Sequence, residues 1–173
     1  MNVGYRRLLL IIPSSIIFFI LVPLISLFFG GKLDQVLGLQ ALRLGLPGTI
    51  ITGILLLVGC YYVLESIKVL FVEGRGIPLG DVFPEDQSTE LVTSGVYSQT
   101  RNPMLFGYLL CLIAMGIMMN SVSIAFIIPA SFIGFWTIWL KTWEEPALEA
   151  RFGEAYTRYR QKTSYLVPRK KNG

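Results

Sequence analysis

The chain has 173 residues, 53% of them hydrophobic, and a mean hydropathy of +0.61. This composition excludes an ordinary soluble domain and is typical of a membrane protein, and the length fits one domain over residues 1–173. The 15 basic and 11 acidic residues leave a net charge of +4, without the broad basic face of a nucleic-acid binder. The chain has no histidine, and Cys60 and Cys111 lie inside apolar runs, so we expect no metal site.

Two apolar runs in residues 1–72 are each long enough to cross a bilayer. The first, residues 8–29, would span about 33 Å as a helix, enough for a hydrocarbon core of about 30 Å. It is too long for the apolar core of a signal peptide and no small-x-small cleavage site follows it, so we expect an uncleaved span. Residues 30–45 are less apolar and predict an interfacial connection. The second span is predicted from residue 46 or 47 to about residue 72.

A polar segment, residues 73–102, precedes an apolar hairpin, residues 103–140. The segment is too short and irregular to be a domain of its own. The hairpin has two apolar legs, 104–119 and 122–140, and the first is short for a crossing, at about 24 Å as a helix. Because a tight hairpin returns the chain to the side it left, the polar loop and the tail are predicted to face the same compartment. The expected fold is an all-α membrane protein with about four transmembrane helices and a C-terminal interfacial amphipathic helix.

The basic residues are distributed unevenly between the two sides of this four-span arrangement. One side holds only Lys32 and Arg43. The other side holds the N-terminus, the 73–102 loop and the tail with all the remaining basic residues, Lys68 lying at its edge. By the positive-inside rule the richer side is cytoplasmic. We therefore expect a multi-pass protein with both termini in the cytoplasm, in the inner membrane of a prokaryote or the endoplasmic reticulum of a eukaryote.

The segment LVTSGVYSQTRNPM, residues 91–104, is unusual as the entrance to an apolar helix. Its Ser-Gly pair predicts a turn, and the Asn-Pro pair at 102–103 is a favourable helix start. Helix geometry alone does not account for Tyr97 and Arg101 in the same turn. The segment is therefore a candidate site for a small polar cofactor at the membrane surface.

The tail, residues 141–173, has the pattern of an amphipathic helix at the interface. One stripe at helical spacing holds Leu148, Phe152, Tyr156 and Tyr159. Glu144 and Glu145 are either acids of its first turn or carboxylates that meet the 73–102 loop. Helical phasing places Glu145 nearer the stripe. Because Pro146 disturbs that phase, either Glu144 or Glu145 can be the carboxylate that meets the loop.

Together, LVTSGVYSQTRNPM and the tail segment EEPALEARFGEAYTRYR resemble the isoprenylcysteine carboxyl methyltransferase family, which overlaps with the phospholipid methyltransferases. The family pattern is Leu-Val-x-x-Gly-x-Tyr, then Arg-His/Asn-Pro, a hairpin, Glu-Glu and Phe-Gly-x-x-Tyr-x-x-Tyr. The segment GRGIP also looks like the Gly-Arg-Gly-Thr-Pro of bacterial members. The resemblance covers roughly residues 75–168, and the order and spacing of the motifs make it specific.

The resemblance implies an integral membrane methyltransferase that uses S-adenosylmethionine (SAM) and has no Rossmann domain. Carried over by position, the cofactor contacts fall on Thr89, Glu90, Leu91, Val92, Gly95, Tyr97, Asn102, Pro103, Met104, Leu105 and Glu144. The same resemblance assigns catalytic roles to Arg101, Glu144 and Glu145. A carboxylate can pair with the SAM ammonium, backbone groups at a helix start can hold the SAM carboxylate, and apolar and aromatic side chains can flank the adenine.

The sequence departs from the family pattern at three positions. Asn102 stands where many members have His, and Leu105 replaces a frequent Tyr. Eukaryotic members have a substrate-facing Arg about one turn before the Glu pair; the corresponding position is Leu140, followed by Lys141, and we expect both to contact the substrate. Lys141 offers a point charge without the bidentate fork of Arg, which weakens the case for an anionic prenylcysteine carboxylate.

The acceptor is expected to be lipophilic and to enter from the bilayer, either as a prenylated cysteine carboxylate or as a phospholipid amine. The catalysis needs alignment, desolvation and exclusion of water, so the absence of His is no obstacle. One alternative is a membrane reductase of similar fold that uses NADPH, which needs a basic clamp for the 2′-phosphate; the loop offers only Arg75 and Arg101. The other is a non-enzymatic four-helix scaffold or transporter, which would place its polar residues at mid-bilayer.

Overall fold

In the computed structural model, which describes residues 20–74 and 88–169, the described chain forms helices and contains no strand. The elements in chain order are α2 (Val22–Val36), α3 (Gly45–Val72), the 3-10 turn η4 (Gly95–Ser98), α4 (Pro103–Met118), the π-turn η5 (Ser123–Ile127), α5 (Ile128–Trp139), the π-turn η6 (Leu140–Glu144), α6 (Glu145–Phe152) and α7 (Glu154–Lys162). This confirms the predicted all-α fold class.

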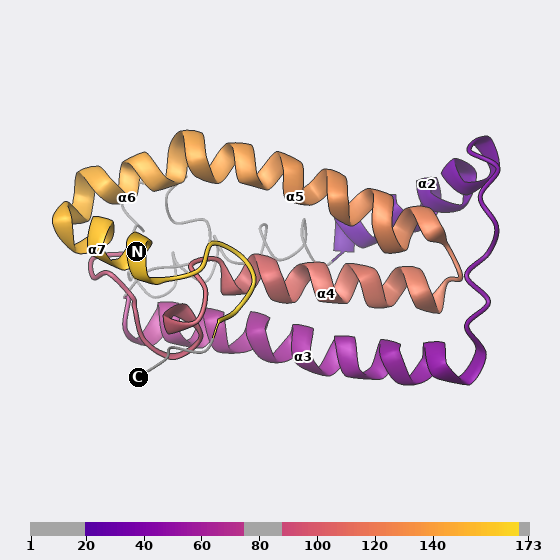
Figure 1. Cartoon of the computed structure of the whole chain (residues 1–173), viewed down its shortest axis with the longest axis horizontal. Coiled ribbons are helices and arrows are strands. Elements are labelled where there is room, and N and C mark those ends of the chain that lie inside the picture. Colours follow the sequence, from indigo (N-terminus) through magenta and orange to yellow (C-terminus); the bar gives the residue numbers. More distant parts are fainter. Residues whose placement is uncertain (1–19, 75–87, 170–173) are drawn as a thin grey trace, which may run out of the picture.

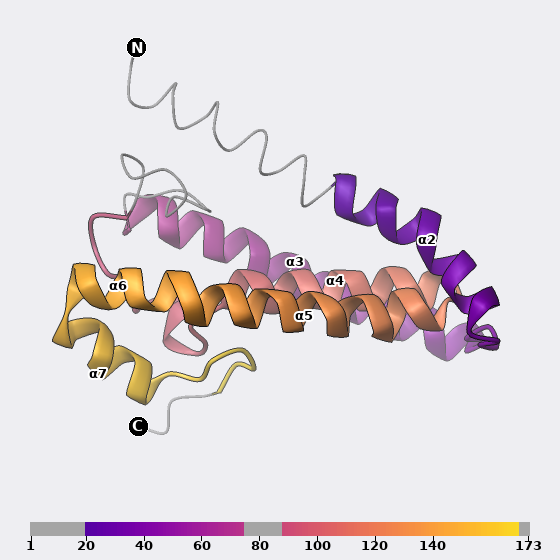
Figure 2. The same ribbon diagram turned by 90° about the horizontal axis from the view of Figure 1, so that it is seen from above.

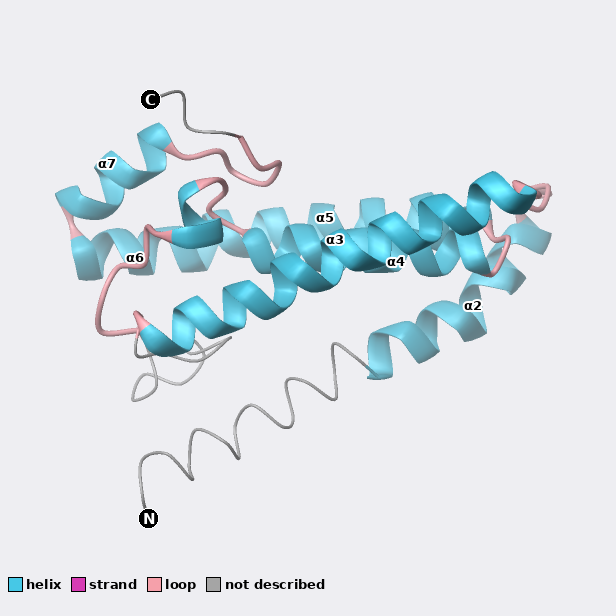
Figure 3. Cartoon of the chain, turned by 90° about the horizontal axis from the view of Figure 1, so that it is seen from below, coloured by secondary structure: helices cyan, strands magenta, loops and turns pink. Residues whose placement is uncertain are grey.

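The helices lie alongside one another as an elongated bundle (Figure 1). α3, α4 and α5 run antiparallel to their neighbours in the chain, and α2 diverges from them (Figure 2). The loop 88–102, α6 and α7 gather at one end, and the turn between α4 and α5 lies at the other (Figure 3). The polar loop and the tail therefore meet at the same end of the bundle, as the hairpin argument predicts.

Two helices are long and apolar enough to cross a membrane: Gly45–Val72, with 28 residues, and the continuous helix Ser123–Phe152, with 30 residues. Pro103–Met118 is a shorter apolar helix. Large hydrophobic side chains such as Leu57 and Leu64 of α3 are exposed, as expected of a surface that faces lipid. Most of the first predicted span, residues 8–29, lies outside the described residues, so the number of four spans stays a prediction.

The first predicted connection is shorter than the sequence indicates, because α2 continues to Val36 instead of ending near residue 29. Asp34 lies in these additional turns and contacts the turn between α4 and α5. Its carboxylate accepts hydrogen bonds from the Ser121 hydroxyl (2.5 Å) and from the Ser123 N–H (2.8 Å), which ties α2 to the α4–α5 turn. Only residues 37–44 remain as the connection to α3.

The return leg of the hairpin continues past residue 140 as one helix to Phe152. Both π-turns in this helix stand two residues before a proline, Pro129 after η5 and Pro146 after η6. A proline within an α-helix lacks an N–H and its ring clashes with the carbonyl four residues earlier. A wider turn accommodates the ring and the helix continues.

The predicted amphipathic tail helix is divided in two. Gly153 adopts a φ of 54°, which ends α6, and α7 begins at the next residue. Such a left-handed conformation is readily accessible to glycine and ends many helices. The turn folds α7 back against the loop 88–102, where Tyr156 becomes buried.

Glycines allow α4 to pack closely against its neighbours. A Cβ added at Gly107 would lie 2.5 Å from the Gly59 carbonyl oxygen, so the backbones of α3 and α4 are in contact there. Next to this contact, Val63, Tyr108 and Leu112 form the buried core of the bundle. The close contact holds α4 against α3 about one turn after α4 begins at Pro103.

We expect Gly116→Ala to destabilise the protein strongly. A Cβ at Gly116 would lie 2.2 Å from the backbone nitrogen of Ala125, and a backbone atom cannot move aside as a side chain can. The free energy of unfolding should fall by about 3 kcal/mol, the upper end of the usual overpacking cost. For a chain of this size the melting temperature in detergent should fall by about 6–12 °C. Gly134→Ala is the matched control, because no atom lies within 4 Å of its added Cβ; equal melting temperatures for both variants would contradict the packing described.

Candidate cofactor site

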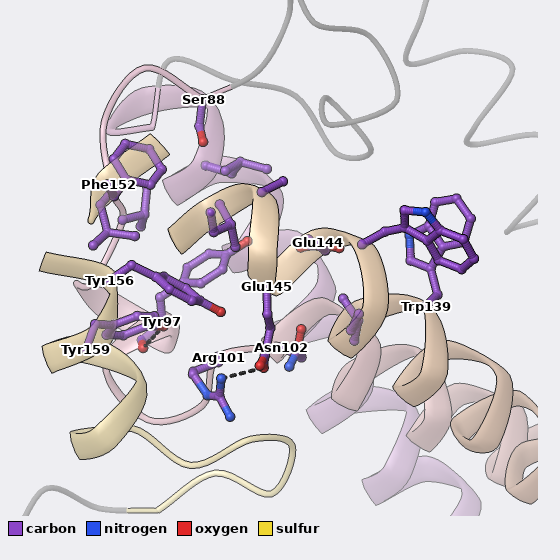
Figure 4. Close-up of a pocket in the computed structure, with 17 residues that line it drawn as sticks. Ser88, Tyr97, Arg101, Asn102, Trp139, Glu144, Glu145, Phe152, Tyr156 and Tyr159 are labelled. Carbon is purple, nitrogen blue, oxygen red and sulfur yellow. Dashed lines mark hydrogen bonds and ion pairs between the residues drawn. The ribbon is translucent and has the colours of Figure 1, made fainter. Parts of the chain in front are cut away.

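A cavity of about 400 Å³ lies where the loop 88–102 meets η6, α6 and α7 (Figure 4). This volume is within the range of small-molecule sites. The loop contributes Ser88, Leu91, Val92, Tyr97, Arg101 and Asn102. The long helix contributes Trp139, Leu140, Trp143, Glu144, Glu145, Ala147, Leu148 and Phe152, and the remaining lining residues are Leu70, Tyr156 and Tyr159.

The cavity brings together eight of the predicted site residues: Leu91, Val92, Tyr97, Arg101, Asn102, Leu140, Glu144 and Glu145. Seven others do not line it: Thr89, Glu90, Gly95, Pro103, Met104, Leu105 and Lys141. Some of these shape the site from outside. Gly95 has a φ of 52° in the turn before Tyr97, and Pro103 begins α4. Their predicted contacts with a cofactor or substrate stay predictions.

Arg101 and Glu145 form an ion pair at the centre of the site. The Arg101 Nη1 and Glu145 Oε1 atoms are 2.5 Å apart, and their side chains are only 13% and 14% exposed. The Arg101 Nε is buried and forms no hydrogen bond within the part of the chain that the structure describes. Its surface is covered by the protein, so this N–H is not presented to the cavity.

Glu144 and Glu145 both line the cavity although they are neighbours in a helix. Successive residues of an α-helix point about 100° apart. The π-turn η6 widens the helix here, with the Glu145 N–H donating to the Leu140 carbonyl five residues earlier. Glu145 then pairs with Arg101, whereas Glu144 lies near Tyr97: burial, together with the charge of Glu144, raises the pKa of the Tyr97 phenol.

Aromatic rings enclose these charged groups. Tyr97, Phe152, Tyr156 and Tyr159 lie on one side of Glu145 and Trp139 lies on the other (Figure 4). The Tyr159 hydroxyl donates to the Tyr97 carbonyl over 2.7 Å. Burial, together with the nearby Glu145, raises the pKa of Tyr156 to about 12, and burial also raises the pKa of Tyr159. Near neutral pH these phenols are therefore uncharged donors and ring surfaces, not bases.

Several lining residues were missed by the sequence analysis as site residues. The spacing of Trp139, Trp143 and Ala147, four residues apart, places them along one helix face and could have indicated the wall that they form with Leu140. The rings of Trp139 and Trp143 lie 5.0 Å apart. No pattern in the sequence marks Leu70 or Ser88 as a residue of the site. The apolar stripe of the tail, Leu148, Phe152, Tyr156 and Tyr159, also lines the cavity.

The family model for phospholipid methyltransferases matches residues 48–155, well over half of the chain. The chain belongs to the phospholipid methyltransferase family. The match extends from α3 to the start of α7, so it includes the loop 88–102, the hairpin and both carboxylates of the cavity. Membership confirms the resemblance stated from the motifs. No curated protein and no solved structure gives a significant match.

Membership makes this chain a membrane methyltransferase, and the cavity lies within the region that defines the family. Among residues 20–74 and 88–169, no group of three or more His, Cys, Asp or Glu side chains is placed to hold a metal ion. Methyltransferases of this family generally use SAM. Arg101, the two carboxylates and the rings around them are the groups that the cavity offers to a ligand.

Proposed function

We propose that this family member is a SAM-dependent methyltransferase that binds SAM in the cavity between the loop 88–102 and α6–α7. The observation that carries the proposal is one enclosed group of charges, Glu144 beside the Arg101–Glu145 pair, surrounded by aromatic rings. SAM has the complementary chemistry, with an ammonium, a carboxylate, a sulfonium and a flat adenine. The volume of about 400 Å³ is of the size that such a molecule needs.

Glu144 is proposed to accept a hydrogen bond from the SAM ammonium, a charge-assisted contact. Arg101 lines the cavity and is proposed to attract the SAM carboxylate, and Glu145 holds its guanidinium in position over 2.5 Å. Tyr97 and Tyr156 present ring faces, which attract cations and stack on a flat base. Each of the two carboxylates thereby has a separate role, which the sequence left open.

When bound, SAM supplies a methyl group activated by its sulfonium. This chain's own residues align the reactants and exclude water, which are the main contributions that a displacement reaction requires. The neutral phenols and apolar side chains that line the cavity suit that task. Arg101 and Glu145 form a fixed dipole already paired before ligand binding, so little reorganisation is needed.

We propose that the acceptor is lipophilic and approaches along the α5–η6 face, where Leu140 and Trp143 line the cavity. Lys141 is exposed next to Leu140 and offers a cation to an anionic group of the acceptor. Both a prenylated cysteine carboxylate and a phospholipid amine satisfy this description. An NADPH reductase is not favoured, because the 2′-phosphate needs a basic clamp and Arg101 is the one basic residue among the described residues that line the cavity.

The proposed reaction can be tested with purified protein in lipid nanodiscs and SAM carrying a labelled methyl group. Phosphatidylethanolamine and a farnesylated cysteine are offered separately, and products are identified by mass spectrometry. We expect labelled methyl to appear in one of the two acceptors. If wild type labels neither acceptor above the background level that Glu144→Gln gives, the proposal is contradicted.

We propose that both termini face the cytoplasm, on the basis of the uneven distribution of Lys and Arg. The side of the membrane that is rich in Lys and Arg includes Arg158, Arg160 and Lys162 of α7. A reporter fused to the C-terminus should therefore be active only inside the cell. The same reporter placed in residues 37–44 should score as external. A C-terminal reporter that scores as external would contradict this topology.

A further inference from the structure

The chain after α7 runs back across the loop that carries Arg101 and Asn102, and we call these residues, 163–169, the C-terminal strap (Figure 1). Two backbone hydrogen bonds hold it there. The Arg101 N–H donates to the Ser164 carbonyl over 2.8 Å, and the Arg169 N–H donates to the Gln99 carbonyl over 3.0 Å. The first of these bonds is part of a parallel bridge between Thr100 and Ser164. The strap therefore pairs with the loop along most of its length.

The Thr100 side chain is the hub of this contact. It is fully buried, at 0% exposure, and its hydroxyl lies 2.9 Å from the Leu166 carbonyl and 3.2 Å from the Tyr165 carbonyl. The same oxygen accepts the Asn102 N–H over 3.3 Å. One buried hydroxyl thus joins the strap to the residue that precedes α4.

The strap also contacts the side chains that the loop presents. The Asn102 amide donates to the Tyr165 carbonyl over 2.8 Å. The Tyr165 ring lies 5.4 Å from the Arg101 guanidinium carbon and 5.7 Å from the Lys141 ammonium, both within the range of cation–π attraction. Arg101 is consequently held by Glu145 at one atom, by Tyr165 at its guanidinium and by Ser164 at its backbone.

None of the residues that line the cavity comes from the strap. Its hydrogen bonds to the loop end on Gln99, Thr100, Arg101 and Asn102, and the last two line the cavity. On the opposite side, the Tyr62 hydroxyl of α3 donates to the Gln99 amide oxygen over 2.8 Å. The loop is therefore clamped between α3 and the strap, and the strap acts on the cavity mainly through the loop.

We propose that Thr100 and Tyr165 are positioning residues of the cofactor site, and that the strap sets the placement of Arg101 and Asn102. This inference rests on the proposed binding of SAM. Two consequences follow. Loosening the strap should weaken SAM while the helices remain folded, and SAM should in turn stabilise the strap, because coupling between two sites is reciprocal.

Thr100→Val tests the first consequence, with Thr100→Ser as its matched control. Valine keeps the volume but removes the hydroxyl, and serine keeps the hydroxyl. Loss of the buried hydrogen bonds should lower SAM affinity by about tenfold or more in Thr100→Val, and Thr100→Ser should stay within about threefold of wild type. Tyr165→Leu should also weaken SAM, because the ring is lost, whereas Tyr165→Phe should not. Circular dichroism of each variant verifies that the helices have formed.

Limited trypsin digestion tests the second consequence, since Lys162 directly precedes the strap and Arg169 is its last residue. SAM should slow cleavage after Lys162 in wild type and in Thr100→Ser, and this protection should be reduced in Thr100→Val. If wild type binds SAM but Thr100→Val binds it equally well with the same protection, the positioning role is refuted. If wild type itself fails to bind SAM, the proposed function is refuted, and the inference falls with it.

Discussion

Glu144→Gln should weaken SAM binding by about tenfold to a hundredfold, the largest effect expected of any single carboxylate in the cavity. A hydrogen bond to a charged group contributes about 1.5–3 kcal/mol, and the amide keeps the size of the side chain while removing its charge. Glu144 lines the cavity near Tyr97, so the lost charge faces the proposed position of the SAM ammonium. The free energy of unfolding without ligand should change by less than about 1 kcal/mol, because glutamine retains the volume and most hydrogen-bonding capacity. Titration calorimetry and thermal melting measure the two quantities separately.

Glu154→Gln is the matched control for this variant. The Glu154 side chain is 90% exposed and pairs at the surface with Arg158 of the same helix, a contact worth less than about 1 kcal/mol. Glu149 is unsuitable as a control, because it holds both Arg160 and Thr157 and so joins α6 to α7. Normal SAM affinity in Glu144→Gln, or an equal loss in Glu154→Gln, would contradict the role given to Glu144.

Glu145→Gln should instead act on stability, lowering the free energy of unfolding by about 3 kcal/mol. Its partner Arg101 is 13% exposed, so removing the carboxylate charge leaves a guanidinium largely buried without compensation. Arg160 also approaches Glu145, to 4.0 Å, but it pairs more closely with Glu149 at 3.1 Å, so the loss falls mainly on Arg101. The melting temperature in detergent should therefore fall by about 6–12 °C. SAM affinity should also fall, because Arg101 loses the contact that orients it.

A double-mutant cycle separates the pair from its surroundings. Arg101→Met removes the buried charge and keeps an apolar stem of similar length. If the two groups interact directly, the double variant Arg101→Met with Glu145→Gln should be more stable than the sum of the single changes predicts, by about 2 kcal/mol. If the shift in melting temperature of the double variant equals the sum of the shifts of the two single variants, the ion pair contributes nothing to the stability of the fold.

The meeting of the loop and the tail could be predicted from the sequence because it follows from large features. Apolar runs of helical length fix the antiparallel order, and the hairpin forces the segments before and after it to the same end of the bundle. The motif residues Tyr97, Arg101, Glu144 and Glu145 consequently do line one cavity. These conclusions need no knowledge of side-chain packing.

The roles within the Glu pair could not be predicted, because they depend on a single widened turn. Pro146 signals a disturbance of the helix, but a kink, a break and a π-turn are all compatible with proline. The π-turn η6 rotates every residue after it relative to those before it, which brings Glu145 to Arg101 and leaves Glu144 near Tyr97. A periodicity argument assumes a constant rotation per residue and fails where one residue is inserted into a turn.

The strap was also beyond sequence analysis. Thr100 and residues 163–169 show no helical or strand period, and their contacts are made chiefly through backbone carbonyls. Such contacts depend on the path of the chain and scarcely on the side chains that it carries. The extension of α2 to Val36 has a similar origin, since the partners of Asp34 lie nearly ninety residues away in the α4–α5 turn.

The central claim is that the cavity binds SAM. Isothermal titration of wild-type protein in nanodiscs with SAM, and separately with NADPH, tests it most directly. We expect one SAM to bind per chain, S-adenosylhomocysteine to compete with it, and NADPH to give no binding heat. NADPH binding at the cavity, or no heat with SAM at any concentration up to the millimolar range, would contradict the account.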